Sequence, residues 1–417
     1  MRLTLPILVS CIVFPVPFSS SLYALGEDTV ELNTILVDAV KLGKSKKFDK
    51  AMEKLELLTP HWQFHAKANL YKQICADYEN EVIDKKTAEE VYKALYEDVN
   101  AKPEKGLKNI NKAAGKSSSY YPIYIIQGEI YASLEDYVRA DAAYTKAVEL
   151  APDAYSPHLF RGKYLSGIGN RRGALSDYSA AIAAEPVPIC YFERGYTYTL
   201  QNRYDEAISD FEAAVKQRPD WRNSTIVNEA YHNRGVQNLE KEAYKQAVGD
   251  FDTAIEINPA YLPSYLSRGM AYRNLRQYGE AMSDFEHCVE VDPKYAEAYY
   301  QMGFTSFKRR LYKKAIPDLK TAIELEPQNT TFIFKLADTY YHLGEYATAV
   351  SHFDKLLEID ANDCWAHYWR AHSLATLGKA TLAIGSFEKF LAIVPSNYQR
   401  QISSAKAEIK RLRRQSG

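Results

Sequence analysis

Few side chains in this sequence have the types and spacing that metal, phosphate or nucleophile chemistry requires. His61 and His65 lie four residues apart, as two ligands on one helix face would, but no Glu follows the first and no third ligand is placed. Gly115-Lys116-Ser117 ends like a phosphate-binding loop, yet Ile110 stands where that loop needs glycine. No Ser, His and Asp set and no Cys and His pair stands out. We therefore expect no enzyme, no metal and no cofactor.

Arginine and aspartate form a more regular chemical pattern. An Arg recurs one residue before a glycine, and an Asp follows that Arg sixteen residues later. Bidentate contacts between guanidinium and carboxylate suit a partly buried crossing of two helices, so we predict structural ion pairs; an anion clamp for a partner is the alternative. Arg370 has no Asp sixteen residues after it, and Asp318 has no Arg sixteen residues before it. The predicted pairs are Arg161 with Asp177, Arg194 with Asp210, Arg234 with Asp250, and Arg268 with Asp284.

These residues belong to a sequence phrase that returns with a period near 34 residues. The phrase is a Gly or Ala, an Ala twelve residues later, an aromatic residue four further on, a small residue after three more, and a Pro after another five. Glycine inside a helix costs about 1 kcal/mol relative to alanine, so close packing of two helices must offset it, and we expect the Ala twelve residues later as its partner. The eight copies begin at Gly128, Gly162, Gly195, Gly235, Gly269, Gly303, Ala337 and Ala371.

Within each copy, apolar residues recur every three or four positions in two runs, which predicts two amphipathic helices joined by a tight turn. The phrase resembles the tetratricopeptide repeat, which has Gly or Ala in its first helix, then Ala, an aromatic residue, Ala and Pro. The resemblance implies an all-α fold, a right-handed α-solenoid of stacked antiparallel helix pairs. The predicted repeats span about residues 121–154, 155–187, 188–221, 228–261, 262–295, 296–329, 330–363 and 364–397.

The remaining segments depart from this period. Six extra residues, 222–227, predict a longer helix or a bulged loop. Residues 25–118 are a divergent helical region, with a degenerate repeat ending near Pro60, helices over 64–78 and 87–99, a short helix to Ala114 and a linker at 115–119. Residues 398–417 carry one narrow apolar stripe, as a capping helix should.

The first 24 residues have the layout of a cleaved secretory signal, with Arg2, an apolar run from Leu3 to Phe18 and small residues before Ala24. The run is too short and too rich in proline for a spanning helix, which needs about 20 apolar residues. We expect export, to the periplasm or outside a bacterial cell or into the secretory pathway of a eukaryotic one. A bacterial lipoprotein box at residues 8–11 is an alternative, although apolar residues follow Cys11.

Composition narrows the range of partners. The chain has 52 basic and 53 acidic residues, a balance that calls for neither nucleic acid nor an anionic membrane surface. No segment after the signal predicts a transmembrane helix, and the later cysteines are too scattered to imply a disulfide framework. Asn223 and Asn329 begin glycosylation sequons, both expected at the surface.

In the tetratricopeptide family, the first helix of each pair lines an inner groove through residues three before, one after, and four or five after the Gly or Ala. The resemblance therefore implies an aromatic groove in the C-terminal half that binds a peptide or a partner helix. Packing between repeats is the alternative for some of these rings. Lys308 adds charge nearby. The expected groove residues are Phe192, Tyr196, Tyr300, Phe304, Phe307, Phe334, Asp338, Tyr341, Trp365, Tyr368 and His372.

The sequence thus predicts an exported scaffold that binds a protein or peptide partner. One alternative is an accessory subunit of an envelope or secretory-pathway complex, with its docking or ligand site in residues 25–118. Self-association by end-to-end stacking of the array is another. The Lys, Asn, Lys and Arg set with which some family members hold chaperone tails cannot be traced in the expected groove.

Overall fold

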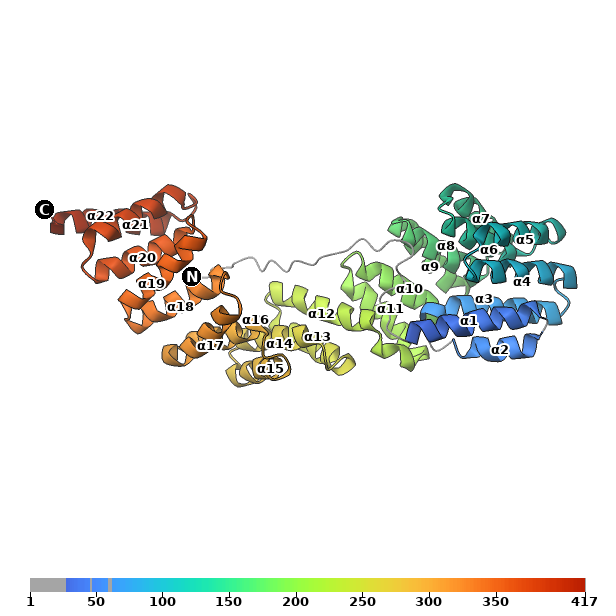
Figure 1. The fold of residues 1–417 in the computed structure, drawn as a ribbon, viewed down its shortest axis with the longest axis horizontal. Coiled ribbons are helices and arrows are strands. Elements are labelled where there is room, and N and C mark those ends of the chain that lie inside the picture. Colours follow the sequence, from blue (N-terminus) through green and yellow to red (C-terminus); the bar gives the residue numbers. More distant parts are fainter. Residues whose placement is uncertain (1–27, 46, 59–61, 417) are drawn as a thin grey trace. The chain divides into compact units, whose positions relative to one another are not determined.

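A computed structural model describes residues 28–45, 47–58 and 62–416, which form 22 α-helices, one 3-10 helix and no strand (Figure 1). The helices stack as antiparallel pairs, so the predicted all-α repeat array is confirmed. The predicted signal at 1–24, Pro60 and His61 lie outside the described residues. Two compact units, Met1–Ala230 and Tyr231–Gly417, make up the chain and are described separately below.

The N-terminal unit begins with five helices of the divergent region: α1 (Asp28–Lys44), α2 (Phe48–Glu56), α3 (Trp62–Glu79), α4 (Lys85–Val99) and α5 (Pro103–Lys116). Three helix pairs follow as repeats 1 to 3. They are α6 (Tyr121–Ser133) with α7 (Tyr137–Leu150), α8 (Tyr155–Gly167) with α9 (Arg171–Ala184), and α10 (Pro188–Thr199) with α11 (Tyr204–Gln217).

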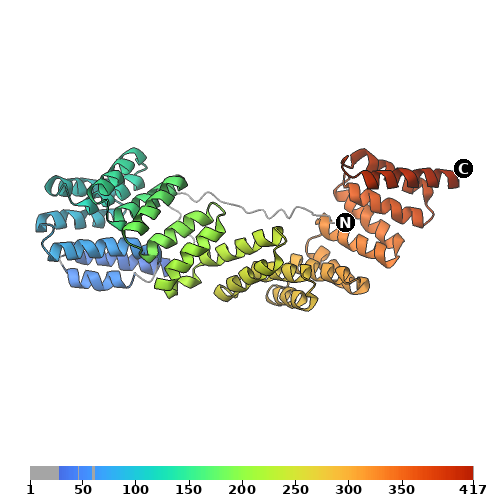
Figure 2. The ribbon, with the colours of Figure 1, turned by 180° about the vertical axis from the view of Figure 1, so that it is seen from behind.

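Helix α12 (Thr225–Glu240) contains the boundary between the units, and with α13 (Tyr244–Ile257) it forms repeat 4. The C-terminal unit continues through repeats 5 to 8 and a final helix, which Figure 2 shows from behind. These helices are α14 (Leu262–Asn274), α15 (Tyr278–Val291), α16 (Ala296–Lys308), α17 (Tyr312–Leu325), α18 (Thr330–Leu343), α19 (Tyr346–Ile359), α20 (Cys364–Thr376), α21 (Ala380–Ile393) and α22 (Gln399–Ser416).

The recurring glycine makes room for the large side chain sixteen residues later. A Cβ atom on Gly269 would lie 2.5 Å from the ring of Phe285, and one on Gly303 would lie 2.7 Å from Leu319. The expected partner, the Ala twelve residues later, also approaches, since its carbonyl oxygen would lie 3.0 Å from a Cβ on Gly195 and 3.1 Å from one on Gly303. The atoms nearest to each of these glycines nevertheless belong to the side chain sixteen residues later.

Each turn between paired helices contains one residue in the left-handed conformation, where a side chain crowds the backbone. Glycine occupies this position in repeats 2, 7 and 8, but larger residues occupy it in the others. The residues, in repeat order, are Glu135, Gly169, Asn202, Glu242, Arg276, Arg310, Gly344 and Gly378, with φ between 58° and 88°.

Helices α4 and α5 form a further repeat that the sequence analysis missed. Ala94, Gly106, Ile110 and Ala113 are buried and have the same spacing as the phrase, and Ala101 in the turn has φ 55°. The predicted linker is present but shorter, at residues 117–120, because α5 extends to Lys116; α5 packs on α6 across it. The degenerate repeat is present as the pair α1 and α2, with Ala39, Ala51, Leu55 and Leu58 buried at the phrase positions.

Both irregular features near the ends of the repeats have clear structural roles. The extra residues 222–227 finish a 3-10 helix, η2 (Pro219–Asn223), and lengthen α12, so both expected outcomes occur. At the C-terminus, α22 packs on α21 and buries Ala405, Ile409 and Leu412 as the predicted cap.

Candidate interaction surfaces

All four predicted Arg to Asp pairs are present, each joining the two helices of one repeat. The Nε and Nη2 atoms of Arg194 donate to the two carboxylate oxygens of Asp210 at 2.7 Å each. The pairs of Arg161 with Asp177 and of Arg268 with Asp284 have the same bidentate form. In repeat 4, the Nε and Nη2 atoms of Arg234 both donate to the Oδ1 atom of Asp250. The four Asp side chains are only 6–7% exposed.

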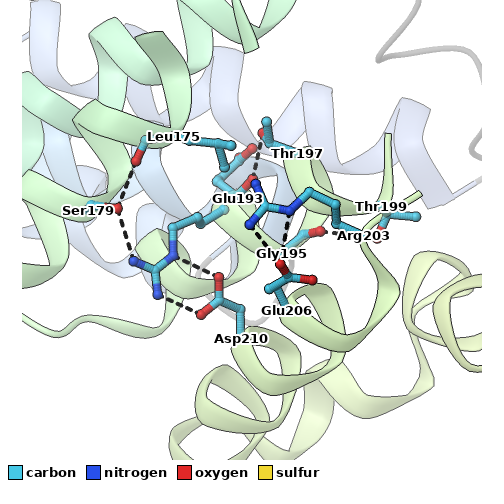
Figure 3. A network of polar contacts seen from close by, with 10 residues as sticks. Leu175, Ser179, Glu193, Gly195, Thr197, Thr199, Arg203, Glu206 and Asp210 are labelled. Carbon is cyan, nitrogen blue, oxygen red and sulfur yellow. Dashed lines mark hydrogen bonds and ion pairs between the residues drawn. The ribbon is translucent and has the colours of Figure 1, made fainter. Parts of the chain in front are cut away.

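Several of these arginines also bind the second helix of the preceding repeat. In Figure 3, Ser179 and Asp210 lie on either side of the guanidinium that they share, which belongs to Arg194. Arg268 likewise donates to Asp252 of repeat 4 at 2.7 Å. Because one guanidinium bonds to two second helices, the arginines hold neighbouring repeats together as well as each pair.

Arg370 and Asp318, the two residues without a partner in the sequence pattern, have different surroundings in the structure. Arg370 is paired after all, with Asp354 of the preceding repeat at 2.5 Å and with the Ser386 hydroxyl. Asp318 has no ion pair among the described residues, and Met302 occupies the position of its arginine. Burial raises the pKa of Asp318 to about 6, and the nearby Glu286 adds to the shift.

The environment of each paired carboxylate decides the direction of its pKa shift. Burial raises the pKa of Asp177, but hydrogen bonds from Arg161 and His158 outweigh it, so the pKa lies below its usual value. Burial raises the pKa of Asp284 above its usual value despite the bond from Arg268. The negative charge of Asp252, which shares that guanidinium, contributes to this rise.

The first helices of successive pairs form one continuous surface in each unit, which we call the first-helix face. In the N-terminal unit it comprises α4, α6, α8 and α10, and helix α3 crosses it in contact with α4, α8 and α10. In the C-terminal unit it comprises α14, α16, α18 and α20, each in contact with the next. No helix among the described residues of that unit crosses this second face as α3 crosses the first.

Helix α3 is bound to the first-helix face by apolar and polar contacts. Leu70, Tyr71 and Ile74 are 0–2% exposed. Lys67 forms an ion pair with Glu129 of α6 at 3.1 Å, and Glu129 is the residue after Gly128, a position at which the family lines its groove. This contact was not predicted, because the expected groove residues begin at Phe192 and include none from repeat 1.

Further polar contacts fix the C-terminal end of α3 at the start of α6. Gln73 donates to the Tyr121 hydroxyl at 2.8 Å, and the Tyr120 hydroxyl donates to Asp77 at 2.6 Å. Burial, and to a smaller extent the hydrogen bond to Asp77, raise the pKa of Tyr120 well above its ordinary value, so the hydroxyl stays protonated and remains a donor. The first-helix face of the N-terminal unit is therefore occupied by a segment of the same chain.

The structure divides the expected groove residues into buried and partly exposed groups. Phe192 is fully buried against Phe211 and Trp221, while Tyr300, Asp338 and Tyr368 are 8–9% exposed. A side chain buried this deeply offers little surface to a partner. The partly exposed residues are Tyr196, Phe304, Phe307, Phe334, Tyr341, Trp365 and His372.

Some of the partly exposed rings pack mainly against the chain itself. Trp365 meets the Tyr398 ring at 4.9 Å, and His372 meets Phe387 at 5.0 Å, so repeat 8 uses these rings near the cap. Burial lowers the pKa of His372 below its usual value. Phe304, Phe307 and Tyr341 remain as a neighbouring group on α16 and α18.

Cations surround Phe304 on this face. The Arg273 guanidinium carbon lies 4.6 Å from the ring centroid, and the amino groups of Lys308 and Lys335 lie 5.1 and 4.9 Å from it. Arg273 is four residues after Gly269, and this is one of the positions at which the family lines its groove. Arg273 was not predicted because the expected groove included no residue of repeat 5, and Lys335 was not predicted because it lies two residues before Ala337, outside the positions that the family uses.

The two sequons have different surroundings. Asn223 is exposed at the end of η2. Asn329 caps α18, since its side-chain oxygen accepts from the backbone of Thr331 at 3.1 Å and its nitrogen donates to Glu326 at 2.9 Å. That nitrogen is the atom that a glycan would modify, so glycosylation there would disturb the contact with Glu326.

Two searches of the described residues concern other classes of site. No group of three His, Cys, Asp or Glu side chains lies together as metal ligands would in the part of the chain that the structure describes. Among the same residues, no helix combines the length and the apolar character needed to cross a bilayer.

Comparison with known families identifies the repeat. Profiles of the tetratricopeptide repeat match residues 121–154 and 262–295, residues 159–220, and residues 306–375. Residues 121–154 and 262–295 coincide with the helix pairs α6 with α7 and α14 with α15, while the other two segments begin inside α8 and α16. The chain therefore contains tetratricopeptide repeats in these segments.

Solved structures with a similar repeat architecture cover parts of the chain. YrrB, described as a TPR protein with an unusual peptide-binding site, is 26% identical, with 46% of this chain and 97% of that chain covered and a TM-score of 0.38. A tetratricopeptide repeat protein from Parabacteroides merdae is 19% identical, with coverages of 62% and 98% and a TM-score of 0.40. The C-terminal part of a repeat protein from Cytophaga hutchinsonii is 18% identical, with coverages of 58% and 97% and a TM-score of 0.48. A search of curated proteins finds no match.

Proposed function

We propose that the protein is an exported interaction scaffold that binds a peptide or helix of a partner protein on the first-helix face of its C-terminal unit. The observation that carries the proposal is the partly exposed aromatic group of Phe304, Phe307 and Tyr341 on adjacent first helices. Membership of a repeat family built for interaction supports it. In the N-terminal unit, by contrast, α3 already covers the corresponding face.

The aromatic group has the properties of an anchor site. Tyr341 packs edge-on against Trp369 with ring centroids 5.0 Å apart, and Phe307 packs against His342 at 5.4 Å. Rings held in this way lose little conformational freedom on binding, and a fully buried aromatic ring removes about 150 to 250 Å² from water. Such anchors carry much of the binding energy at protein interfaces.

Peptide display against the immobilised chain from residue 25 onward tests the proposal. We expect a recurrent apolar motif among the selected peptides. Affinity for a selected peptide should fall more than tenfold in the variant Phe304→Ala with Tyr341→Ala, because each truncation removes an anchor. The matched control is Tyr278→Ala, a partly exposed aromatic on a second helix of the same unit, which should bind normally.

Two results would contradict this assignment. One is the absence of any recurrent motif. The other is unchanged affinity in the double variant, provided that circular dichroism shows the same helix content as the wild type. Tyr368 is not used as a test position, because it is 8% exposed and its loss would disturb the core around Phe390.

Export is the second component of the proposal and rests on the pattern of residues 1–24. Mass spectrometry of the N-terminal peptide of the protein purified from its own cells tests it. We expect the mature chain to start at Leu25. Recovery of the intact N-terminus from the cytoplasm would show that the protein is not exported.

A further inference from the structure

The cations around Phe304 come from three successive first helices of the C-terminal unit. Arg273 belongs to α14, Lys308 to α16 and Lys335 lies on α18. Lys335 also lies 4.5 Å from the ring centroid of Phe307, so the cations and the aromatic anchors occupy one site. Cations over aromatic rings are attracted to the ring face but gain no neutralising charge from it.

Only one of these three cations has a carboxylate partner. Lys335 donates to Asp338 at 2.9 Å, and Asp338 also contacts His342 at 3.3 Å. Among the described residues, neither Arg273 nor Lys308 forms an ion pair with a carboxylate. Arg273, only 8% exposed, donates instead to the amide oxygen of Gln301.

The site therefore holds more positive charge than its own residues neutralise. Gln301 donates to Glu297 at 2.6 Å, which places a neutral amide between that carboxylate and Arg273. Partial burial lowers the pKa of Lys308, the charges of Lys335 and Arg273 lower it further, and the charge of Asp338 opposes them only in part. Burial also lowers the pKa of Arg273 to about 10. A carboxylate entering this site would relieve the repulsion and would be only partly screened by salt.

The N-terminal unit shows what kind of segment covers a first-helix face. There α3 supplies Lys67 to Glu129, the residue directly after Gly128. In repeat 6 the residue directly after the glycine is Phe304, and the surrounding charge is positive instead of negative. The occupant of the second face should therefore resemble α3 in form and carry the opposite charge.

We propose that the first-helix face of the C-terminal unit binds an amphipathic helix of a partner protein, with an Asp or Glu side chain against Lys308 and Lys335, above the buried charge of Arg273, and an apolar side chain on Phe304 and Phe307. This inference rests on the proposed function and specifies its partner. The ligand is an acidic side chain within a helix and not a chain terminus.

The test uses a displayed library of amphipathic 18-residue peptides with randomised polar positions, selected on the chain from residue 25 onward. We expect Asp or Glu to be enriched at one polar position beside the apolar motif. Changing that acid to its amide in a selected peptide should weaken binding about tenfold, the effect of losing one charge-assisted contact. Raising the salt concentration should weaken the acidic peptide more than its amide.

Charge reversal at an exposed residue provides the decisive variant. Lys308→Glu should abolish the acid preference and favour Lys or Arg at the same peptide position, while the apolar motif persists. The matched control is Lys314→Glu, an exposed residue on the second helix of the same repeat, which makes the same change in net charge. It should leave the acid preference intact.

The outcomes separate this inference from the proposed function. An apolar motif without acid enrichment, or the same acid enrichment in Lys308→Glu, would overturn the acidic helix but leave the scaffold function standing. A library that yields no recurrent motif on the wild type would overturn both. Loss of the apolar motif together with the acid preference in Lys308→Glu, at unchanged helix content, would also overturn the assignment, because the acid and the anchors would then not be separable parts of one site.

Discussion

Repeats 5 and 6 are built on the same phrase and both carry the aspartate, but only repeat 5 has the arginine sixteen residues before it. Repeat 5 has Arg268 and Asp284, which form a bidentate pair at 2.6 and 2.9 Å. Repeat 6 has Met302 and Asp318 at the same places, and the pKa of Asp318 is raised to about 6, chiefly by burial. The helices pair in both repeats, so the ion pair is not what makes the helices associate.

The difference shows what the arginine contributes. It neutralises a buried carboxylate, and in repeat 5 it also reaches Asp252 of repeat 4. The apolar contact between the glycine and the side chain sixteen residues later is present in both repeats. Packing therefore forms each helix pair, while the arginine decides how stable the pair and its junction with the preceding repeat become.

The largest expected effect comes from giving repeat 5 the residue of repeat 6. Arg268→Met should lower the free energy of unfolding at pH 7 by about 3 kcal/mol, because Asp284 and Asp252 lose their shared cation. Urea unfolding followed by circular dichroism measures the loss. Met302→Leu is the control and should cost less than about 1 kcal/mol. Equal losses in the two variants would mean that the pair contributes nothing beyond packing.

The reciprocal change should stabilise repeat 6. Met302→Arg places a guanidinium beside Asp318, which should raise the free energy of unfolding by about 1 to 2 kcal/mol and lower the carboxyl pKa. Urea unfolding at pH 7 measures the gain. Met302→Lys should give less, because an ammonium group cannot form the bidentate contact. A loss of stability with Arg would show that repeat 6 has no room for the pair.

The pH dependence of stability should reveal the unpaired carboxylate. The folded pKa of Asp318, about 6, lies above the unfolded value of about 4, so the folded state holds a proton that the unfolded state has lost between these values. The contribution of Asp318 to the free energy of unfolding therefore falls as the pH rises from about 4 to 6. The difference in free energy of unfolding between Asp318→Asn and the wild type should therefore change by about 1 kcal/mol in favour of the variant over that range, after allowance for the partial exposure of Asp318. Urea unfolding at each pH measures it.

Asp177 provides the control of opposite sign. Its folded pKa lies below the usual value, so its contribution is present above the unfolded pKa and is lost as the pH falls. The advantage of the wild type over Asp177→Asn should therefore shrink as the pH falls below about 4. If Asp318→Asn and Asp177→Asn changed in the same direction with pH, the contrast between paired and unpaired carboxylates would be wrong.

The smallest effect concerns a feature that the two repeats share. Arg276 and Arg310 occupy the left-handed turn position with φ 63° and 59°, where repeat 7 has Gly344. Arg276→Gly and Arg310→Gly should each raise the free energy of unfolding by about 0.5 to 1 kcal/mol, because glycine adopts this conformation without strain. Thermal unfolding measures both. Gly344→Ala should cost a similar amount, and a gain from it would rule out this account.

Features that depend on residues close in the chain were predictable. The phrase predicted the helix pairs, and the spacing of sixteen residues predicted all four ion pairs, because a fixed turn brings those positions of two antiparallel helices together. The repeat formed by α4 and α5 was missed because Ile110 replaces the aromatic residue, although the small residues keep their spacing. Arg273 was missed because the expected groove included no residue of repeat 5.

Local spacing within about 34 residues was enough to dictate that this chain folds into stacked helix pairs, since each pair is held by contacts inside its own repeat. Exposure on the first-helix face was decided by distant segments. Helix α3 covers the surface around Glu129, and no such cover lies over Phe304 among the described residues. The burial of a residue depends on which other segments of the chain pack against it, and the spacing of residues within one repeat does not predict those segments.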